Sequence, residues 1–486
     1  MPFPDFREIP SELLTPGAFV EVDGSGALSD RSIGKPRKAL LIGPAAAGAT
    51  VADNEPVRII RAREAVTYHG AGSILAQMAD DYRALDPRRD LYTISAEVSE
   101  GTASVHSLTL SGTASVSGTF ARYIAGELVT VEAASGDTAA EVASALKDAI
   151  VARSTLPVVA TVTDAVVTLT HRAAGAFGDE LLVYSVPGRP DPAGITAAET
   201  IATAGVGTPD LTAVFDALAA DQYDWIGLAY HDDAALDLVD AELARRFGAM
   251  VAMDSRAFAA QPGHLVAVTT ASGDRNSPHL ALVGAQQSPT PSWRITAQVT
   301  AARMAQDGYG YPLGGTVLPR VLAPASADRL TRGERDVLLR DGVSTLKVDA
   351  SGRVAIERIV STYTTDPSTG ASDITWRDLS TSETLGYLRW DWIDRIGHKY
   401  RGYKLGKNGV AVDPDVKAVT PKLLEAEAVI WFREHERRGL VQDVAGFKRD
   451  LHAQLDGTDP NRINLLMPPD LVGKFLVLAT DLAFRL

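Results

Sequence analysis

The last residues of the chain follow an apolar pattern with a period of two. In KFLVLATDLAFRL (474–486), apolar side chains recur at every second position and are interrupted only by Thr480. Alternation of this kind indicates a half-buried strand. The positions of this parity are Leu476, Leu478, Leu482, Phe484 and Leu486. We therefore expect a strand arm over 474–486, longer than the usual strand of about 5–6 residues.

Apolar strands alternate with amphipathic helices through much of the chain. A strand is expected at Lys38–Ile42 and a helix around Gly72–Leu85. The strand DWIGLAY (Asp224–Tyr230) precedes a helix at Ala234–Arg246, and the expected further strands are AMVAMD, HLVAVTT and HLALVG. This order predicts an α/β core with a largely parallel sheet covered on both faces.

Small and β-branched residues dominate a block at about 98–187. The pentapeptide GTASV occurs twice in it, at Gly101–Val105 and Gly112–Val116. Thr138 and Glu141 have the spacing of a capping box, which predicts the start of a helix. We expect this block to be a small β-rich domain inserted into the main one, with the Pro- and Gly-rich PGRPDPAG closing it as a linker.

The last third of the chain contains helices with clear start and stop signals. Thr331 and Glu334 form a second capping box, and the hairpin STLKVDASGRVAIERIVSTY follows it. A further helix is expected to begin near Thr381. Thr420 and Pro421 match the N-cap and first position of another helix. These elements predict a compact α+β domain.

The pattern as a whole predicts an α/β multidomain protein with extended arms at both ends. The expected divisions are an N-terminal arm (1–35), the first part of the core (36–97), the inserted β-rich outer domain (98–187), a linker (188–204), the α/β core (205–340), a C-terminal α+β domain (341–473) and the C-terminal strand arm (474–486).

Composition narrows the possible partners. The 486 residues include 61 acidic and 47 basic ones, and the resulting net charge of −14 argues against direct binding of nucleic acid. The absence of Cys excludes disulfides, thiolate zinc sites and cysteine nucleophiles, and suits a reducing cytosol. We expect neither a signal peptide nor insertion into a membrane.

Candidate chemical motifs are weak. GPAAAGAT (Gly43–Thr50) resembles a phosphate-binding loop, but Ala49 replaces the required Lys, so a plain turn after a strand is the better interpretation. GVG at Gly205–Gly207 lacks a third glycine and a preceding strand. The nine His are scattered, and HDD (His231–Asp233) is interpreted as a helix N-cap. We expect no cofactor and no metal.

A serine hydrolase is the enzymatic alternative on such a core. Asp274, Ser277 and His279 lie close together in GDRNSPHLAL, although triad members normally come from separate elements. A structural turn that leads into a strand is the favoured interpretation, with Asn276 and Asp274 capping backbone groups. We expect no catalytic residue.

A local positive patch stands out on this acidic chain. It consists of Arg389, Arg395, Lys399, Arg401 and Lys404. A solvated helix face is the simpler interpretation. The functional one is a surface that faces a tube or a neighbouring subunit of opposite charge.

Five stretches in the same order along the chain carry a resemblance to a known family. They are IPSELLTPGAFVEVD, SGDRNSPH, VLAPASADRLTRGERDVLLRDGVSTLKVDASGRVAIERIVSTY, SDITWRDLSTSETLGYLR and DPNRINLLMPPDLVGKFLVLATDLAFRL. Together they resemble the tail sheath proteins of contractile-tailed, Mu-like bacteriophages. That family has an α/β core described as subtilisin-like, a fold label that implies no peptidase, and variable outward-facing domains on the core.

The resemblance implies a mechanical function. Sheath subunits form stacked hexameric rings, a helical tube around the tail tube, and contract to drive that tube through the bacterial envelope for genome delivery. Further implied partners are baseplate and tail terminator proteins, and the implied location is the virion, after assembly in the host cytoplasm. The sheath of a phage-tail-like bacteriocin or of another contractile injection system is the alternative.

The resemblance also gives the arms a role. In the family, terminal arms add strands to a sheet of neighbouring subunits, which is β-augmentation. The residues implied to lie between subunits are Phe19, Val20 and Val22 near the N-terminus and Leu476, Leu478, Leu482, Phe484 and Leu486 at the C-terminus.

Overall fold

The structure is a computed structural model, and it describes residues 35–96, 98, 101–181, 183–273, 275–409 and 416–483. The chain divides into two compact units, Met1–Pro36 and Arg37–Leu486. Only Lys35 and Pro36 of the first unit are described, so the predicted N-terminal arm (1–35) lies outside the described residues except for Lys35.

An eight-stranded mixed sheet forms the centre of the second unit, in the order β15-β14-β13-β12-β11-β1-β3-β2. The six strands from β14 to β3 run parallel to one another, while the edge strands β15 and β2 are antiparallel to their neighbours. The strand bounds are β1 (Lys38–Gly43), β2 (Val57–Ile59), β3 (Asp90–Ser95), β11 (Trp225–Leu228), β12 (Arg256–Gln261), β13 (Leu280–Gly284), β14 (Val343–Val348) and β15 (Val354–Arg358). The prediction of a largely parallel sheet is therefore confirmed.

Continuous apolar sequence explains why these strands lie in the interior. β1 reads KALLIG and β13 reads LALVG, and both are buried along almost their whole length, as strands covered on both faces are. The helices of this region are α1 (Ala62–His69), α2 (Ile74–Leu85), α4 (Leu211–Leu218), α5 (Asp233–Phe247), α6 (Leu265–Gly273), α7 (Ser292–Ala305) and α8 (Arg332–Arg340).

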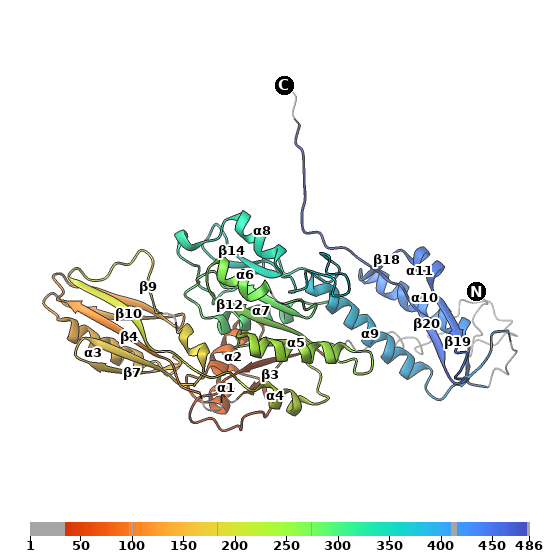
Figure 1. Cartoon of the computed structure of the whole chain (residues 1–486), viewed down its shortest axis with the longest axis horizontal. Helices are drawn as coiled ribbons and strands as arrows, with labels where there is room; N and C mark the ends of the chain where they lie inside the picture. The colour runs from red at the N-terminus through yellow and green to blue at the C-terminus, as the bar shows by residue number, and fades with distance from the viewer. Residues whose placement is uncertain are drawn as a thin grey trace, which may run out of the picture. The chain divides into compact units, whose positions relative to one another are not determined.

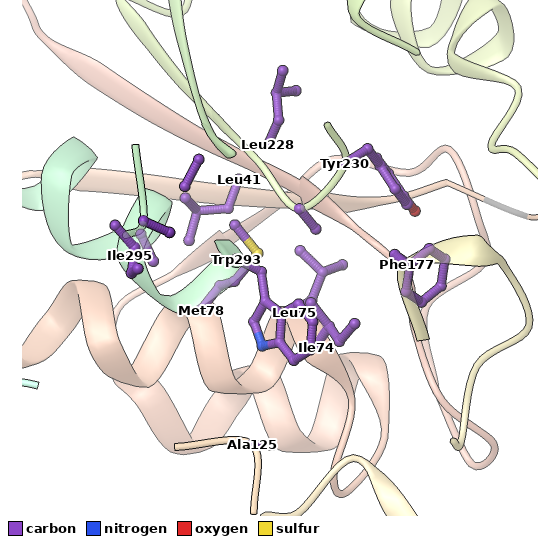
Figure 2. Packing of buried hydrophobic residues seen from close by; sticks show 14 of the residues in the cluster. Leu41, Ile74, Leu75, Met78, Ala125, Phe177, Leu228, Tyr230, Trp293 and Ile295 are labelled. Carbon is purple, nitrogen blue, oxygen red and sulfur yellow. The ribbon is translucent and has the colours of Figure 1, made fainter. Parts of the chain in front are cut away.

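Helix α7 lies inside the protein, and only Ala305 of its residues is not buried. Its Trp293 packs among Ile74, Leu75 and Met78 of α2 (Figure 2), and these residues belong to one apolar cluster. The Trp293 indole nitrogen donates to Gln77 Oε1 at 3.0 Å. The helix therefore holds α2 against the sheet.

The inserted block contains two smaller sheets and a helix (orange to yellow in Figure 1). One sheet has the order β10-β4-β8-β7 and the other β6-β5-β9. Thr138 and Glu141 form the predicted capping box at the start of α3. The elements are β4 (Val105–Gly112), β5 (Gly118–Ile124), β6 (Glu127–Ala133), α3 (Ala139–Val151), β7 (Val158–Thr163), β8 (Val166–His171), η1 (Ala176–Glu180), β9 (Val183–Ser185) and β10 (Ile195–Thr203).

The predicted linker at 188–204 is wrong over most of its length. Residues Ile195–Thr203 form β10, which pairs antiparallel with β4. Most of its residues are exposed, so nothing forces its sequence, ITAAETIAT, to alternate apolar and polar side chains. Such a strand carries no alternating apolar signal, so the sequence pattern could not reveal it.

Two predicted strands near residue 260 are also wrong. HLVAVTT forms α6, and AMVAMD forms a turn that precedes β12. Because β12 and β13 are parallel, the chain needs a crossover between them, and α6 supplies it. A short run of β-branched residues does not distinguish a strand from a helix by periodicity alone.

The C-terminal part begins later than the predicted boundary at 341. The predicted hairpin is present as β14 and β15, but β14 pairs with β13 and thus belongs to the central sheet. The helix α9 (Leu379–Lys399) then leads to a separate apolar cluster built around Trp431, Phe432 and Phe447. The other elements of the C-terminal part are β16 (Lys404–Leu405), β17 (Ala418–Val419), α10 (Pro421–Arg437), β18 (Val441–Gln442), α11 (Val444–Asp450), β19 (His452–Leu455), β20 (Ile463–Leu466) and β21 (Asp470–Leu471). The short helix η2 (Ser326–Asp328) precedes α8 in the core region.

Candidate assembly surface

The C-terminal arm is exposed in the single chain. After β21, no described residue as far as Ala483 lies in a helix or strand (Figure 1). Phe475, Val477, Leu478 and Leu482 are 79%, 80%, 72% and 88% exposed. Consecutive large apolar side chains are seldom left in water unless another surface covers them. Phe484 and Leu486 lie outside the described residues, as do Phe19, Val20 and Val22.

The root of this arm is held by the protein's own surface. Lys474 Nζ donates to Thr381 Oγ1 at 3.0 Å and lies 3.8 Å from a carboxylate oxygen of Asp378. Burial lowers the pKa of Lys474, an effect that Asp378 partly offsets. Leu476 lies beside Tyr311 and Pro312 in the lining of a pocket and is 40% exposed, much less than Leu478. Leu476 is therefore the last residue of the arm that packs against the folded unit, and the described residues after it extend into solvent.

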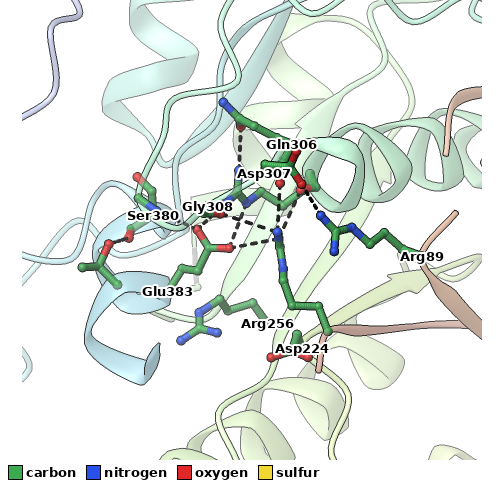
Figure 3. A network of polar contacts seen from close by, with 12 residues as sticks. Arg89, Asp224, Arg256, Gln306, Asp307, Gly308, Ser380 and Glu383 are labelled. Carbon is green, nitrogen blue, oxygen red and sulfur yellow. Dashed lines mark hydrogen bonds and ion pairs between the residues drawn. The ribbon is translucent and has the colours of Figure 1, made fainter. Parts of the chain in front are cut away.

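The arm root, Lys474, contacts the N-terminal end of helix α9. A buried network of charged residues holds this helix end in place (Figure 3). Glu383 accepts hydrogen bonds from Arg303 at 2.9 and 2.7 Å, from Arg37 at 3.3 Å and from the Gly310 amide at 3.1 Å. Burial alone would raise the pKa of Glu383, but the nearby guanidinium groups outweigh this effect and hold it below its usual range. The carboxylate is therefore a stable anion inside the protein.

This network was missed by reasoning from the sequence. Arg37, Arg303 and Glu383 are far apart in the chain and belong to no short motif. The available signal was Arg303, a charged residue in the segment QVTAARMA, which contains no other charge. A charge at such a position is seldom buried without a partner.

Short two-stranded sheets lie in the C-terminal part. In the region that the structure describes, β19 pairs only with β20, and β18 only with β21. A two-stranded sheet is marginally stable by itself, and its open edges can accept a further strand. Leu466 on β20 is 62% exposed, so this edge carries an apolar side chain in water.

The predicted positive patch is largely neutralised within the chain. Arg389 contacts Asp254, Arg395 contacts Glu427 and Glu434, and Lys399 contacts Glu427. These ion pairs join α9 to α10 and to the segment before β12. The remaining members of the patch, Arg401 and Lys404, are exposed. A docking role for the patch stays a prediction, supported mainly by those two residues.

The candidate hydrolase residues are not arranged as a nucleophile and a base. Ser277 and His279 are 1% and 3% exposed. The His279 Nδ1 lies 2.9 Å from Ser382 Oγ, and burial followed by the charges of Arg256 and Arg389 lowers its pKa to about 3. Asp274 lies outside the described residues. Asn276 caps the backbone amides of Thr364 and Thr365, as the structural interpretation predicts.

The remaining sequence motifs have local structural roles. GPAAAGAT follows β1 as a turn in which the Ala46 amide donates to the His69 carbonyl at 2.8 Å. Asp232 is the N-cap of α5, as predicted. Among the residues that the structure describes, no group of three or more His, Asp or Glu side chains is placed to hold a metal ion. No helix within the described ranges has both the length and the hydropathy to cross a bilayer.

Comparison with known proteins identifies the family. Residues 204–362 match the family model described as the phage tail sheath protein central domain. Over 492 residues the chain is 32% identical to the Mu-like prophage FluMu tail sheath protein of Haemophilus influenzae, with 99% of each chain covered.

Solved structures of sheath proteins show weaker likeness. The sheath tail protein from Desulfitobacterium hafniense matches with a TM-score of 0.48 and 13% identity, over 94% of this chain and 100% of that one. The anti-feeding prophage helical sheath in its contracted state matches with a TM-score of 0.47 and 10% identity, over 97% and 98% of the two chains. Because the sequence identity to the Haemophilus protein extends over nearly the full length of both chains, this chain belongs to the family of phage tail sheath proteins, among its Mu-like members.

Proposed function

We propose that this structural protein polymerises as stacked hexameric rings, which build a helical sheath around the tail tube. Contraction of the sheath then drives the tube through the bacterial envelope and so delivers the genome. Family membership makes the chain a component of a phage tail, and hence of the virion. In this proposal the subunits assemble in the host cytoplasm, with the tail tube, baseplate and tail terminator proteins as partners and without any enzymatic step.

The exposed C-terminal arm is the observation that carries the proposal. Its apolar side chains lie in water beyond Leu476, although the rest of the chain buries large apolar clusters. An arm of this kind gains stability when its backbone pairs with a sheet edge and its alternate side chains enter pockets there. A neighbouring subunit supplies such an edge in any polymer of this chain.

The two-stranded sheets of the C-terminal part are the proposed receiving surface. A third strand would turn β19–β20 from a marginal pair into a sheet with a protected edge. The apolar Leu466 on β20 offers a contact for an incoming leucine. In the same way, we assign the N-terminal residues Phe19, Val20 and Val22 to a second strand that enters a neighbour.

Strand linkage suits a sheath that must change length without coming apart. Main-chain hydrogen bonds hold the added strand, while the arm between the strand and the folded unit can change direction. Rings can therefore rotate relative to one another and remain connected. Contraction is then a change between two packed arrangements of the same subunits, driven by the interface gained in the shorter state.

Electron microscopy of the purified protein tests this proposal. We expect the full-length chain to form long tubes or stacked rings when it is concentrated. Deletion of Leu476–Leu486 should yield monomers or isolated rings with an unchanged circular dichroism spectrum. Tubes of normal length from the truncated protein would contradict the proposed role of the arm.

The sheath of a phage-tail-like bacteriocin would share the same subunit design. Neighbouring genes separate the two possibilities, because capsid and terminase genes accompany only a complete phage. A hydrolase on the α/β core is the weaker alternative, and loss of an esterase or peptidase activity in a Ser277→Ala variant would support it.

A further inference from the structure

The first residue of the folded unit and the first residue of the C-terminal arm both contact one short stretch of α9. Arg37 is the first residue of the folded unit after the N-terminal segment, and its Nη2 donates to Glu383 Oε1 at 3.3 Å. Lys474 begins the C-terminal arm and donates to Thr381 Oγ1 at 3.0 Å. Thr381 and Glu383 are two positions apart on a helix, so their side chains point to different sides of it. The two roots therefore hold the same helix end from different sides.

The N-terminal root is fixed by several contacts at once. The Arg37 side chain is 5% exposed and donates from Nη1 to the Gln306 carbonyl at 2.9 Å and from Nη2 to the Arg303 carbonyl at 3.2 Å. Its guanidinium lies 5.4 Å from the centre of the Tyr309 ring. A buried guanidinium with this many acceptors cannot move without moving its partners, because each lost contact would leave a polar group unpaired.

Lys474, the root of the C-terminal arm, has fewer contacts than Arg37, and these contacts lie at the same end of α9. The Lys474 side chain is 14% exposed and lies between Thr381 and Asp378, the N-cap residue of α9. Asp378 also accepts from Arg358 of β15 at 3.1 Å. The contacts at Lys474 thus tie the start of the arm to α9 and, through Asp378, to the edge of the central sheet.

We infer that the first turns of α9 are a common anchor for the roots of both arms, in which Glu383 positions the N-terminal root and Thr381 the C-terminal root. This inference rests on the proposed function, since it concerns chain ends that we assign to neighbouring subunits. Backbone hydrogen bonds make the helix end move as one body, so a displacement of Glu383 also displaces Thr381. A force on the arm that enters one neighbouring subunit is therefore transmitted through α9 to the other arm.

A thiol probe at the C-terminal root tests the coupling. The chain contains no Cys, so Leu476→Cys introduces a single thiol whose rate of reaction with Ellman's reagent reports release of this root. We expect Arg37→Met, in the full-length Leu476→Cys protein, to raise this rate by about three-fold or more, because sites linked by a shared backbone shift are energetically coupled. Arg37→Lys, which keeps the charge, should give a smaller increase.

Arg389→Met is the matched control. Arg389 also lies on α9 and contacts Asp254, but it contacts neither arm root. We expect it to leave the labelling rate at position 476 within about two-fold of the parent. An unchanged rate in Arg37→Met, or an equal increase in Arg389→Met, would overturn the inference. If Arg37→Met fails to fold, the labelling rate of Arg37→Lys is compared with the rates of the parent and of Arg389→Met instead.

The assay separates this inference from the proposed function. Labelling is measured on the monomer isolated by gel filtration, so it needs no tube to form. Failure of the full-length protein to assemble would count against the sheath proposal and leave the labelling result valid. Normal tubes together with an uncoupled root would count against the common anchor alone.

Discussion

Arg303 of α7 and Glu383 of α9 form a two-pronged ion pair, in which Nε donates to Oε1 at 2.9 Å and Nη2 to Oε2 at 2.7 Å. Both side chains are almost completely buried. The pair joins the helix at the centre of the α/β core to the helix that leads into the C-terminal part. It also lies beside Arg37, the first residue of the folded unit, which donates to the same carboxylate.

Removal of the carboxylate from this pair should strongly lower the free energy of unfolding. In Glu383→Gln, two guanidinium groups stay buried without their anion, and we expect the free energy of unfolding to fall by about 3–5 kcal/mol. Urea denaturation measures this change. Asp336→Asn removes an exposed ion pair with Arg340 and should lower the free energy of unfolding by less than about 1 kcal/mol. Equal losses in the two variants would contradict the assigned role of Glu383.

The parity of the C-terminal arm can be tested with one charge. If one parity faces the neighbour, Leu478→Asp places a carboxylate in an apolar pocket, which is strongly unfavourable, and should abolish tubes. Val477→Asp, one position away, should leave tubes intact because its side chain faces the other way. Electron microscopy and sedimentation compare the two. The same result for both variants would rule out a period-two strand.

Buried histidines should make stability depend on pH. Burial lowers the pKa of His69 to about 4, below the value of about 6.5 in an unfolded chain. Between these values the unfolded state binds more protons, so the free energy of unfolding falls as the pH falls, by up to about 1.4 kcal/mol per pH unit from this residue. His69→Gln should reduce the slope between pH 6.5 and 4.

Denaturation curves at a series of pH values check this prediction. Above pH 7.5 His69 is neutral in both states, so the difference between His69→Gln and the parent should there be independent of pH. An identical slope in the two proteins between pH 4 and 6.5 would contradict the assigned titration.

The C-terminal part should lose stability separately from the core. Phe432 stacks on Phe447 with ring centroids 4.2 Å apart, in a cluster distinct from the main one. Phe432→Ala should cost about 3–5 kcal/mol and make this part sensitive to limited proteolysis before the central sheet is. Ile430→Ala is the control, because Ile430 is 49% exposed on the same helix. Simultaneous cleavage of both parts would argue against separate stability.

The inserted block should be removable. Its ends meet at Thr102 and Val206, whose backbone groups exchange hydrogen bonds of 2.9 and 3.1 Å. Replacement of 103–205 by a short Gly-Ser loop should therefore leave a folded core, with a melting temperature lowered by several degrees. The reduction follows from the loss of contacts such as that between Phe177 and Tyr230, at 5.5 Å. Circular dichroism measures the melting, and an unfolded product would show that the core depends on the insert.

Local signals in the sequence predicted local structure well. The capping boxes at Thr138 and Thr331 and the N-cap at Thr420 are all present, because each depends on hydrogen bonds within three residues. The largely parallel sheet was predictable for a related reason, since continuous apolar strands require cover on both faces. The edge strand β10 and the crossover helix α6 were not predictable from the sequence. Whether each segment forms a strand or a helix depends on strands that lie far away in the chain.

By itself, the sequence determined the family, the α/β class and the alternating pattern of the C-terminal arm. Only the tertiary structure decided that Lys474 and Arg37 meet the same end of α9, and that most of the positive patch is neutralised by Glu427, Glu434 and Asp254. The reason is physical. Capping and periodicity act between neighbours in the chain, whereas buried ion pairs join residues that only folding brings within a few ångströms of each other.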